Sequence, residues 1–341
     1  MRTGTSEFFK RAAIVVAVAL VPVLIWFLFD LILITMGAIL VAVLLRLGCE
    51  PLTRWAKLPQ SVALCLSGLF VAAVIGGAAY LFGSQISSEL QDVMARVIEA
   101  QKGITADLQG SGFGRFLLSH IQSDSFSIST LLQKVFAIST NFLAALVVTV
   151  IAGIYFATQP RLYQEGLLHL FPRRMRGNVR ETTDDVANAL RLWMIGQLIQ
   201  MIMIGILSTF AVWLIGLPSA LALGVIAGVA EFIPYLGPII AAVPAVLVAA
   251  TQDWHAVLWT LVAYTAIHQV EGNVFVPLIQ RHMVFIPPAL ILLGIVAIGL
   301  LFGPVAIIFA TPIAVVVFVL VKKLYVRDAL GEPTPIPGEP S

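Results

Sequence analysis

The segment Glu231-Phe-Ile-Pro-Tyr-Leu-Gly-Pro238 interrupts a long apolar stretch, Leu217–Ala250, and the shorter Phe302-Gly-Pro304 interrupts a second one, Pro287–Val321. Each arm of these stretches has about 15 residues and, as a helix, measures roughly 22 Å, which is short of the ~30 Å hydrocarbon core of a bilayer. We therefore predict two hairpins that each enter and leave the membrane on one side. Such paired stretches are typical of transporter substrate sites, because the interruption frees backbone dipoles to meet a solute.

The composition indicates a polytopic membrane protein. Of the 341 residues, 60% are hydrophobic and 11% are charged, and the mean hydropathy is +1.00. One soluble core cannot bury so much apolar surface. The basic residues behind the net charge of +2 are interleaved with apolar segments, so no nucleic-acid partner is expected. The two cysteines and five histidines have no metal-ligand spacing, so neither a metal nor a cofactor is expected.

The hydrophobic pattern predicts an all-α, polytopic helical protein with about eight membrane segments, counting the two Gly/Pro-broken, re-entrant hairpins. As one helix, Ala12–Leu45 would be ~51 Å long, so we expect the chain to reverse near Asp30. The remaining full spans are expected at Val62–Gly83, Val135–Thr158, Leu192–Gly216 and Trp254–Val270.

These spans divide the chain into N-terminal membrane helices, an extracytoplasmic segment with an amphipathic helix, a transport core and a tail. The tail is rich in Pro and Glu, which predicts disorder. The predicted bounds are 1–83 for the three N-terminal helices, 84–134 for the extracytoplasmic segment, 135–330 for the core, with a basic cytoplasmic loop at 159–191 and the broken hairpins at 217–250 and 287–321, and 331–341 for the tail.

The distribution of basic residues predicts the orientation. With the N-terminus in the cytoplasm, most of the 20 Lys and Arg residues fall in cytoplasmic segments, and both termini are cytoplasmic. The first broken stretch then begins outside and the second inside, which predicts that the two hairpins are inverted relative to each other. Two full spans in place of each hairpin give the same parity and stay an alternative.

Polar residues next to the breaks are the candidate binding residues. A charge near the bilayer centre costs ~2.5 to 3.5 kcal/mol and needs a partner or water. A carboxylate beside helix ends is suited to bind a cation or carry a proton, and carboxamides are suited to bind a hydroxylated solute. The candidates are Glu231, Pro234, Gly237, Pro238, Gln269, Glu271, Asn273, Gly303 and Pro304. The alternative is structural: Glu231 caps a helix end, and Glu271 is neutralised by Arg281 at the cytoplasmic interface.

Several motifs resemble those of a known family, the AI-2E (autoinducer-2 exporter-like) transporters, which includes the PerM permeases. The resemblance is specific from Ala189 to Val321. It rests on Gly216-Leu-Pro-Ser-Ala-Leu221, Glu231-Phe-Ile-Pro-Tyr-Leu-Gly-Pro238, Ala242-Val-Pro-Ala245, Gln269-Val-Glu-Gly-Asn-Val-Phe-Val-Pro277, and Phe302-Gly-Pro304 with Thr311-Pro312.

This resemblance implies a multi-span transporter of the bacterial inner membrane that has no ATPase of its own. Members of the family look functionally divided. The namesake activity is efflux of a small furanose-like quorum-sensing signal, and other members resemble Na⁺(Li⁺)/H⁺ antiporters. The resemblance therefore implies a small-molecule or cation substrate without naming it.

Two classes of function stay open. The chain has no Gly-x-x-x-x-Gly-Lys-Ser/Thr loop and no nucleophile elbow, so neither ATP-driven pumping nor an enzyme is expected. The first hypothesis is a secondary transporter, exporting a small hydrophilic solute such as a quorum-sensing signal, or else a Na⁺(Li⁺)/H⁺ antiporter. Glu231→Gln or Asn273→Ala is then expected to abolish flux. The second is a non-transporting membrane scaffold, whose outside helix at Ser84–Gln101 binds partners or a second copy in a homo-oligomer.

Overall fold

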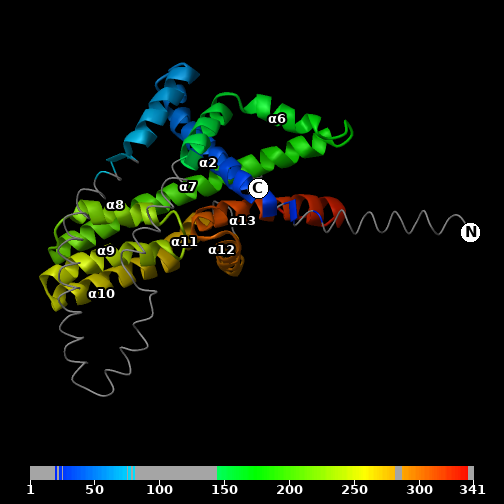
Figure 1. Cartoon of the computed structure of the whole chain (residues 1–341). Coiled ribbons are helices and arrows are strands. Elements are labelled where there is room, and N and C mark those ends of the chain that lie inside the picture. The colour runs from blue at the N-terminus through cyan, green and yellow to red at the C-terminus, as the bar shows by residue number, and fades with distance from the viewer. Residues whose placement is uncertain are drawn as a thin grey trace, which may run out of the picture.

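The computed structural model describes residues 20–80, except 21, 22, 25, 75, 78 and 79, together with 144–280 and 286–336. Helices make up all the regular structure of these residues, which confirms the all-α class (Figure 1). The predicted extracytoplasmic segment, 84–134, lies outside the described residues, and so does most of the first predicted span. Among the described residues, three helices are long and apolar enough to cross a membrane: Phe29–Arg54, Arg176–Ile215 and Pro304–Ala329.

The first described helix, α2 (Phe29–Arg54), has 26 residues, or about 39 Å, and contains no reversal near Asp30. The amide of Ile32 donates to the carbonyl of Leu28 at 2.9 Å, and the amide of Leu28 donates to the carbonyl of Leu24 at 2.9 Å. The predicted reversal is therefore wrong. Asp30 stands exposed in the first turn of α2, where an acidic side chain is favourable and leaves the backbone hydrogen bonds intact.

The predicted basic loop at 159–191 is helical. Helix α6 (Pro160–His169) follows the helix Ala144–Thr158 with a bend of 93°. Pro160 stands at the first position of α6, where a missing amide costs no hydrogen bond. After a short turn, the 40-residue helix α7 (Arg176–Ile215) begins and continues through the predicted span as one rod of about 60 Å.

The first broken stretch forms the predicted helical hairpin. Gly216, in the left-handed conformation, ends α7, and the chain turns back into α8 (Ala220–Ala230). A turn at residues 231–236 then leads into α9 (Gly237–Gln252), and α10 (Trp254–Val270) follows. Helices α8 and α9 measure about 16 and 24 Å, so neither spans the ~30 Å hydrocarbon core. Figure 1 shows α8, α9 and α10 stacked beside α7.

The second broken stretch is a hairpin with unequal arms. Its first arm is α12 (Pro288–Phe302), which ends at Gly303. The second arm combines the 3₁₀ turn η3 (Pro304–Phe309), α13 (Ala310–Leu320) and the π-helical η4 (Val321–Ala329) into one 26-residue run. The prediction of two short arms is wrong for this second arm, because the helical run continues past Val321, where the apolar stretch ends, to Ala329.

Two of the buried apolar clusters meet along α7. The C-terminal half of α7 packs with α8, α9 and α10 around Ile204 and Tyr264. Its N-terminal half packs with α2 and α13 around Leu190 and Val315. Large apolar side chains elsewhere point outward, such as Leu300, which is 83% exposed. Such side chains suit contact with lipid.

Three glycines bring α7 and α8 together. A Cβ atom on Gly224 would lie 2.7 Å from the carbonyl oxygen of Gly205, and one on Gly228 would lie 2.6 Å from that of Met201. No side chain fits at these distances. Small residues allow membrane helices to pack this closely, and here they hold the first arm of the hairpin against α7.

The first half of the predicted disordered tail packs against the helices. The Lys322 ammonium donates to the carbonyl of Pro335 at 3.2 Å, and Ile336 is 3% exposed within the same cluster as Leu190. The predicted disorder is therefore wrong for residues 331–336, because the apolar side chain of Ile336 anchors this Pro-rich segment. Residues 337–341 lie outside the described part of the chain.

Candidate functional site

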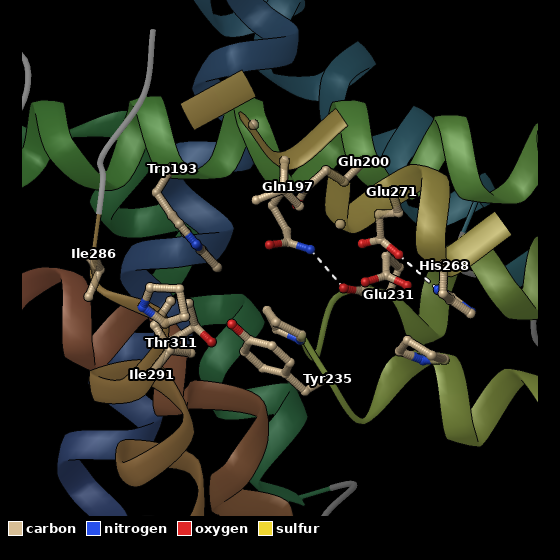
Figure 2. A pocket seen from close by; sticks show the side chains of 16 residues that line it. Trp193, Gln197, Gln200, Glu231, Tyr235, His268, Glu271, Ile286, Ile291 and Thr311 are labelled. Atoms are coloured by element: carbon tan, nitrogen blue, oxygen red, sulfur yellow. Dashed lines mark hydrogen bonds and ion pairs between the residues drawn. The ribbon is translucent and has the colours of Figure 1, made fainter. Parts of the chain in front are cut away.

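A cavity of about 460 Å³ opens where the tip of the first hairpin meets α7, the end of α10 and the second hairpin. Its wall combines carboxylates, carboxamides, a hydroxyl, an imidazole and two aromatic rings, as Figure 2 shows. The lining residues are Trp193, Gly196, Gln197, Gln200, Glu231, Pro234, Tyr235, Pro238, His268, Glu271, Gly272, Val276, Ile286, Pro288, Ile291 and Thr311.

Glu231 lies at the C-terminal end of α8 and is 3% exposed. Its backbone carbonyl accepts a hydrogen bond from the carboxamide of Gln197, also buried, at 2.7 Å. This bond ties the hairpin tip to the middle of α7. Among the described residues, the Oε2 atom of Glu231 has no hydrogen-bond partner, although it is buried. Burying an unpaired carboxylate oxygen is costly, so the site favours a ligand that supplies positive charge or a donor.

Glu271 and His268 face Glu231 from the end of α10. The Nδ1 atom of His268 lies 2.8 Å from Oε2 of Glu271, and both side chains are largely buried. Glu271 begins the π-helical turn η2 (Glu271–Phe275), which joins α10 to α11 (Val276–Gln280). One carboxylate oxygen each from Glu231 and Glu271 and one ring nitrogen of His268 lie within 4.8 Å of one another. Two carboxylates this close in a buried place repel each other, and a cation between them relieves the repulsion.

The other side of the cavity is aromatic and hydroxyl-bearing. Trp193 is held by an edge-to-face contact with Phe232, with ring centroids 5.9 Å apart. Figure 2 shows Trp193 and Thr311 at the end of the cavity opposite the carboxylates, with Tyr235 below the space between them. An aromatic wall that faces polar groups suits a small ring-shaped solute with hydroxyl groups.

A sequence model of the family described as AI-2E family transporter matches residues 14–325. The chain belongs to this family. It is 34% identical to the proposed transport protein YrrI of Bacillus subtilis (strain 168) over 166 residues, which are 49% of this chain and 47% of that protein, so the match spans about half of YrrI. A proposed transport protein of Thermotoga maritima is 26% identical over 278 residues, covering 81% of this chain and 84% of that protein. The sequence-based recognition of the AI-2E family is thereby confirmed.

Four residues that the sequence singled out line the cavity of this AI-2E family member: Glu231, Pro234, Pro238 and Glu271. Gly237 lies beneath them, where a Cβ atom would approach the carbonyl oxygen of Ala230 to 2.5 Å. Glycine is therefore needed for the hairpin tip to close at this position.

The other four candidates lie away from the cavity lining. Asn273 is exposed, and its carboxamide donates to the carbonyl of Gln269 at 2.8 Å and to that residue's side-chain oxygen at 3.2 Å. These two residues satisfy each other outside the cavity, one turn apart on the helix. Gly303 and Pro304 form the break between α12 and η3.

Five polar lining residues are absent from the candidates that the sequence indicated: Gln197, Gln200, Tyr235, His268 and Thr311. Gln197 and Gln200 stand three positions apart in the otherwise apolar span of α7, and His268 stands three positions before Glu271. In each case a polar residue within an apolar segment is the feature of the sequence that indicates a functional role. The five histidines show no metal-ligand spacing among themselves. The spacing of histidines alone cannot reveal the carboxylates of Glu231 and Glu271, which the fold brings close to His268.

Proposed function

We propose that this AI-2E family member is a secondary transporter that exports a small hydrophilic solute, of the class of quorum-sensing signals, through the cavity at the first hairpin tip. One observation carries the proposal: a cavity with both polar and aromatic walls lies among apolar helices, at the end of a helix pair too short to cross the membrane. Helix ends at such breaks place backbone dipoles and polar side chains where a solute binds.

The chemistry of the wall supports a hydroxylated solute. Gln197 and Gln200 offer both donors and acceptors from α7, and the carboxylates of Glu231 and Glu271 accept hydrogen bonds from hydroxyl groups. Trp193 offers a flat apolar surface to one face of a ring. A volume of about 460 Å³ lies within the usual range of ~300 to 1,000 Å³ for small-molecule sites.

The position of the cavity also supports alternating access. Its walls come from one packed group, α8 to α10 with the C-terminal half of α7, and from a second group, which contains α12, α13 and the N-terminal half of α7. Movement of one group against the other would open the cavity first to one side of the membrane and then to the other. We place the protein in the bacterial inner membrane on the strength of the family resemblance.

Efflux from proteoliposomes tests the proposal. Vesicles loaded with a radiolabelled furanose-type signal are diluted, and release is compared for the wild type, Glu231→Gln and the exposed control Glu332→Gln. We expect the wild type and the control to release the solute at equal rates and Glu231→Gln to be slowed at least ~10-fold, the effect of losing one hydrogen bond to a charged group. Release no faster than from loaded vesicles that lack the protein would favour the scaffold hypothesis.

A second function, Na⁺(Li⁺)/H⁺ antiport, is favoured by the buried pair of carboxylates, Glu231 and Glu271. Negative charge beside helix ends is a common arrangement for binding a coupling cation. The measurement follows the internal pH of inside-out vesicles with a fluorescent dye as Na⁺, Li⁺ or K⁺ is added. Antiport predicts a pH change on adding Na⁺ or Li⁺ that disappears in Glu231→Gln, and no response to any cation would contradict it.

A further inference from the structure

The cluster of Glu231, His268 and Glu271 has the chemistry of a metal centre. We infer that these three residues bind a divalent transition-metal ion at the wall of the cavity. The ligand atoms come from the end of α8, the end of α10 and the first residue of η2, and all lie within 4.8 Å of one another. Figure 2 shows the two carboxylates and the imidazole converging on one point.

An unpaired buried atom points to a missing ligand independently of this clustering. Oε2 of Glu231 is buried and has no hydrogen-bond partner within the described part of the chain, and the residue as a whole is 3% exposed. The carbonyl of the same residue is already held by Gln197, so the backbone is fixed while the carboxylate stays available. A metal ion would satisfy this oxygen and neutralise both carboxylates together.

The three ligand atoms need to move only a little to bind one metal ion. Any two ligands of a tetrahedral ion with bonds of ~2.1 Å stand about 3.4 Å apart. The three ligand atoms here all lie within 4.8 Å of one another, so no pair must approach by more than about 1.4 Å. Nδ1 of His268 and Oε2 of Glu271 are 2.8 Å apart, a hydrogen-bond distance, so a metal ion would take the place of the proton between them and the two atoms would move slightly apart. Rotation of the Glu231 carboxylate, whose Oε2 is tied to no partner among the described residues, is the simplest way to close the rest.

The donor set selects the class of metal. An imidazole nitrogen beside two carboxylates suits Zn²⁺, Mn²⁺, Fe²⁺, Co²⁺ or Ni²⁺, whereas alkali ions, Mg²⁺ and Ca²⁺ prefer oxygen ligands alone. Three protein ligands leave at least one coordination position open. Because all three ligands line the cavity, a water or a solute oxygen in the cavity can complete the shell.

Metal binding is tested on the purified full chain in detergent after treatment with a chelator. Equilibrium dialysis against Zn²⁺ or Mn²⁺, with excess Na⁺ and Mg²⁺ present, measures the number of ions bound and the affinity. We expect one ion per chain, and an affinity at least ~10-fold lower in Glu231→Gln, His268→Gln and Glu271→Gln, as for the loss of a metal ligand or its supporting partner. The controls His255→Gln, on the same helix, and Glu332→Gln keep the wild-type affinity.

An absorption spectrum of bound Co²⁺ distinguishes the loss of a metal ligand from misfolding of the variant. Co²⁺ bound to the wild type is expected to show visible absorption bands that shift in His268→Gln, while size-exclusion profiles of both proteins stay alike. Absence of stoichiometric binding by the wild type, or unchanged affinity and spectrum in His268→Gln, would overturn the inference. The inference does not rest on the proposed transport: bound metal without solute efflux would refute only transport, and efflux without bound metal would refute only the metal site.

Discussion

Gly216 and Gly303 each end a membrane helix with a positive φ, but their backbones differ. Gly216 has φ 82° and ψ 19°, the left-handed conformation that asparagine also adopts. Gly303 has φ 90° and ψ 175°, a region that is essentially restricted to glycine. A Cβ atom at either position would meet no atom of the described residues within 4 Å, so a difference between the two substitutions reflects backbone strain.

We therefore expect Gly303→Asn to destabilise the protein by ~1 to 3 kcal/mol more than Gly216→Asn. The strain arises because asparagine fits the left-handed conformation at residue 216 and not the backbone at residue 303. Thermal unfolding of the two variants in the same detergent measures the difference. Equal losses of stability would show that the break between α12 and η3 is not held in this conformation.

The close contact between helices α7 and α8 fixes the position of the hairpin tip against α7. Gly228 packs directly on the backbone of α7, since a Cβ there would come within 2.6 Å of the Met201 carbonyl oxygen. Gly294, in α12, is also helical, but a Cβ atom added to it would meet nothing within 4 Å. The two glycines form a matched pair for testing the packing.

Gly228→Ala is expected to lower stability by ~1 to 3 kcal/mol, because the added methyl group forces the two helices apart. Gly294→Ala is expected to be neutral or to stabilise α12 by up to ~1 kcal/mol, since alanine favours the helix. Unfolding temperatures of both variants give the comparison. A tolerated methyl group at residue 228 would contradict the close approach of α8 to α7.

The elements that the sequence predicted well are those with local signals. Gly237 and Pro238 mark the hairpin tip, because glycine and proline set backbone geometry wherever they fall in the chain. The end of an apolar stretch misled, since the second arm of the second hairpin continues past Val321 to Ala329. Asp30 also misled, because one charge on a helix surface does not interrupt its backbone.

At the scale of the whole molecule, charged side chains join three elements at one end. The guanidinium of Arg191 on α7 lies 2.5 Å from the carboxylate of Glu50 on α2. Lys323 on η4 is 3% exposed, binds Glu181 on α7 and lies 3.6 Å from Asp185. The end of α2, the first half of α7 and the start of η4 therefore lie on one side of the molecule, the arrangement that the distribution of basic residues predicts for the cytoplasmic side.

Labelling of single cysteines tests this orientation. In a background with the exposed Cys65 changed to Ser, Gly177→Cys and Asp328→Cys are expected to react with an impermeant thiol reagent only in inside-out vesicles. Trp254→Cys is expected to react in right-side-out vesicles, because α9 and α10 meet near Gly216, at the opposite end of α7. Labelling of residues 177 and 328 from opposite sides would contradict the arrangement.

The cavity itself depends on contacts between distant parts of the chain. Glu231 and Glu271 were found because each is a charge within an apolar segment, but Gln197 joins them only through its hydrogen bond to the carbonyl of Glu231, 34 residues away. Asn273 seemed equivalent to Glu271 in the sequence, and the helix turns it to the outer surface instead. Spacing along the chain does not contain this information, because helix packing decides which side chains converge.

Gln200 lines the cavity and Asn273 lies outside it, so the two residues show whether solute passes through the cavity. Each is replaced by Cys in the Cys65→Ser background, and solute efflux is measured before and after a thiol reagent is added. We predict that the reagent stops efflux in Gln200→Cys, that the solute protects this residue, and that labelled Asn273→Cys keeps its rate. Efflux that survives labelling at residue 200, or stops on labelling at residue 273, would place the solute path elsewhere.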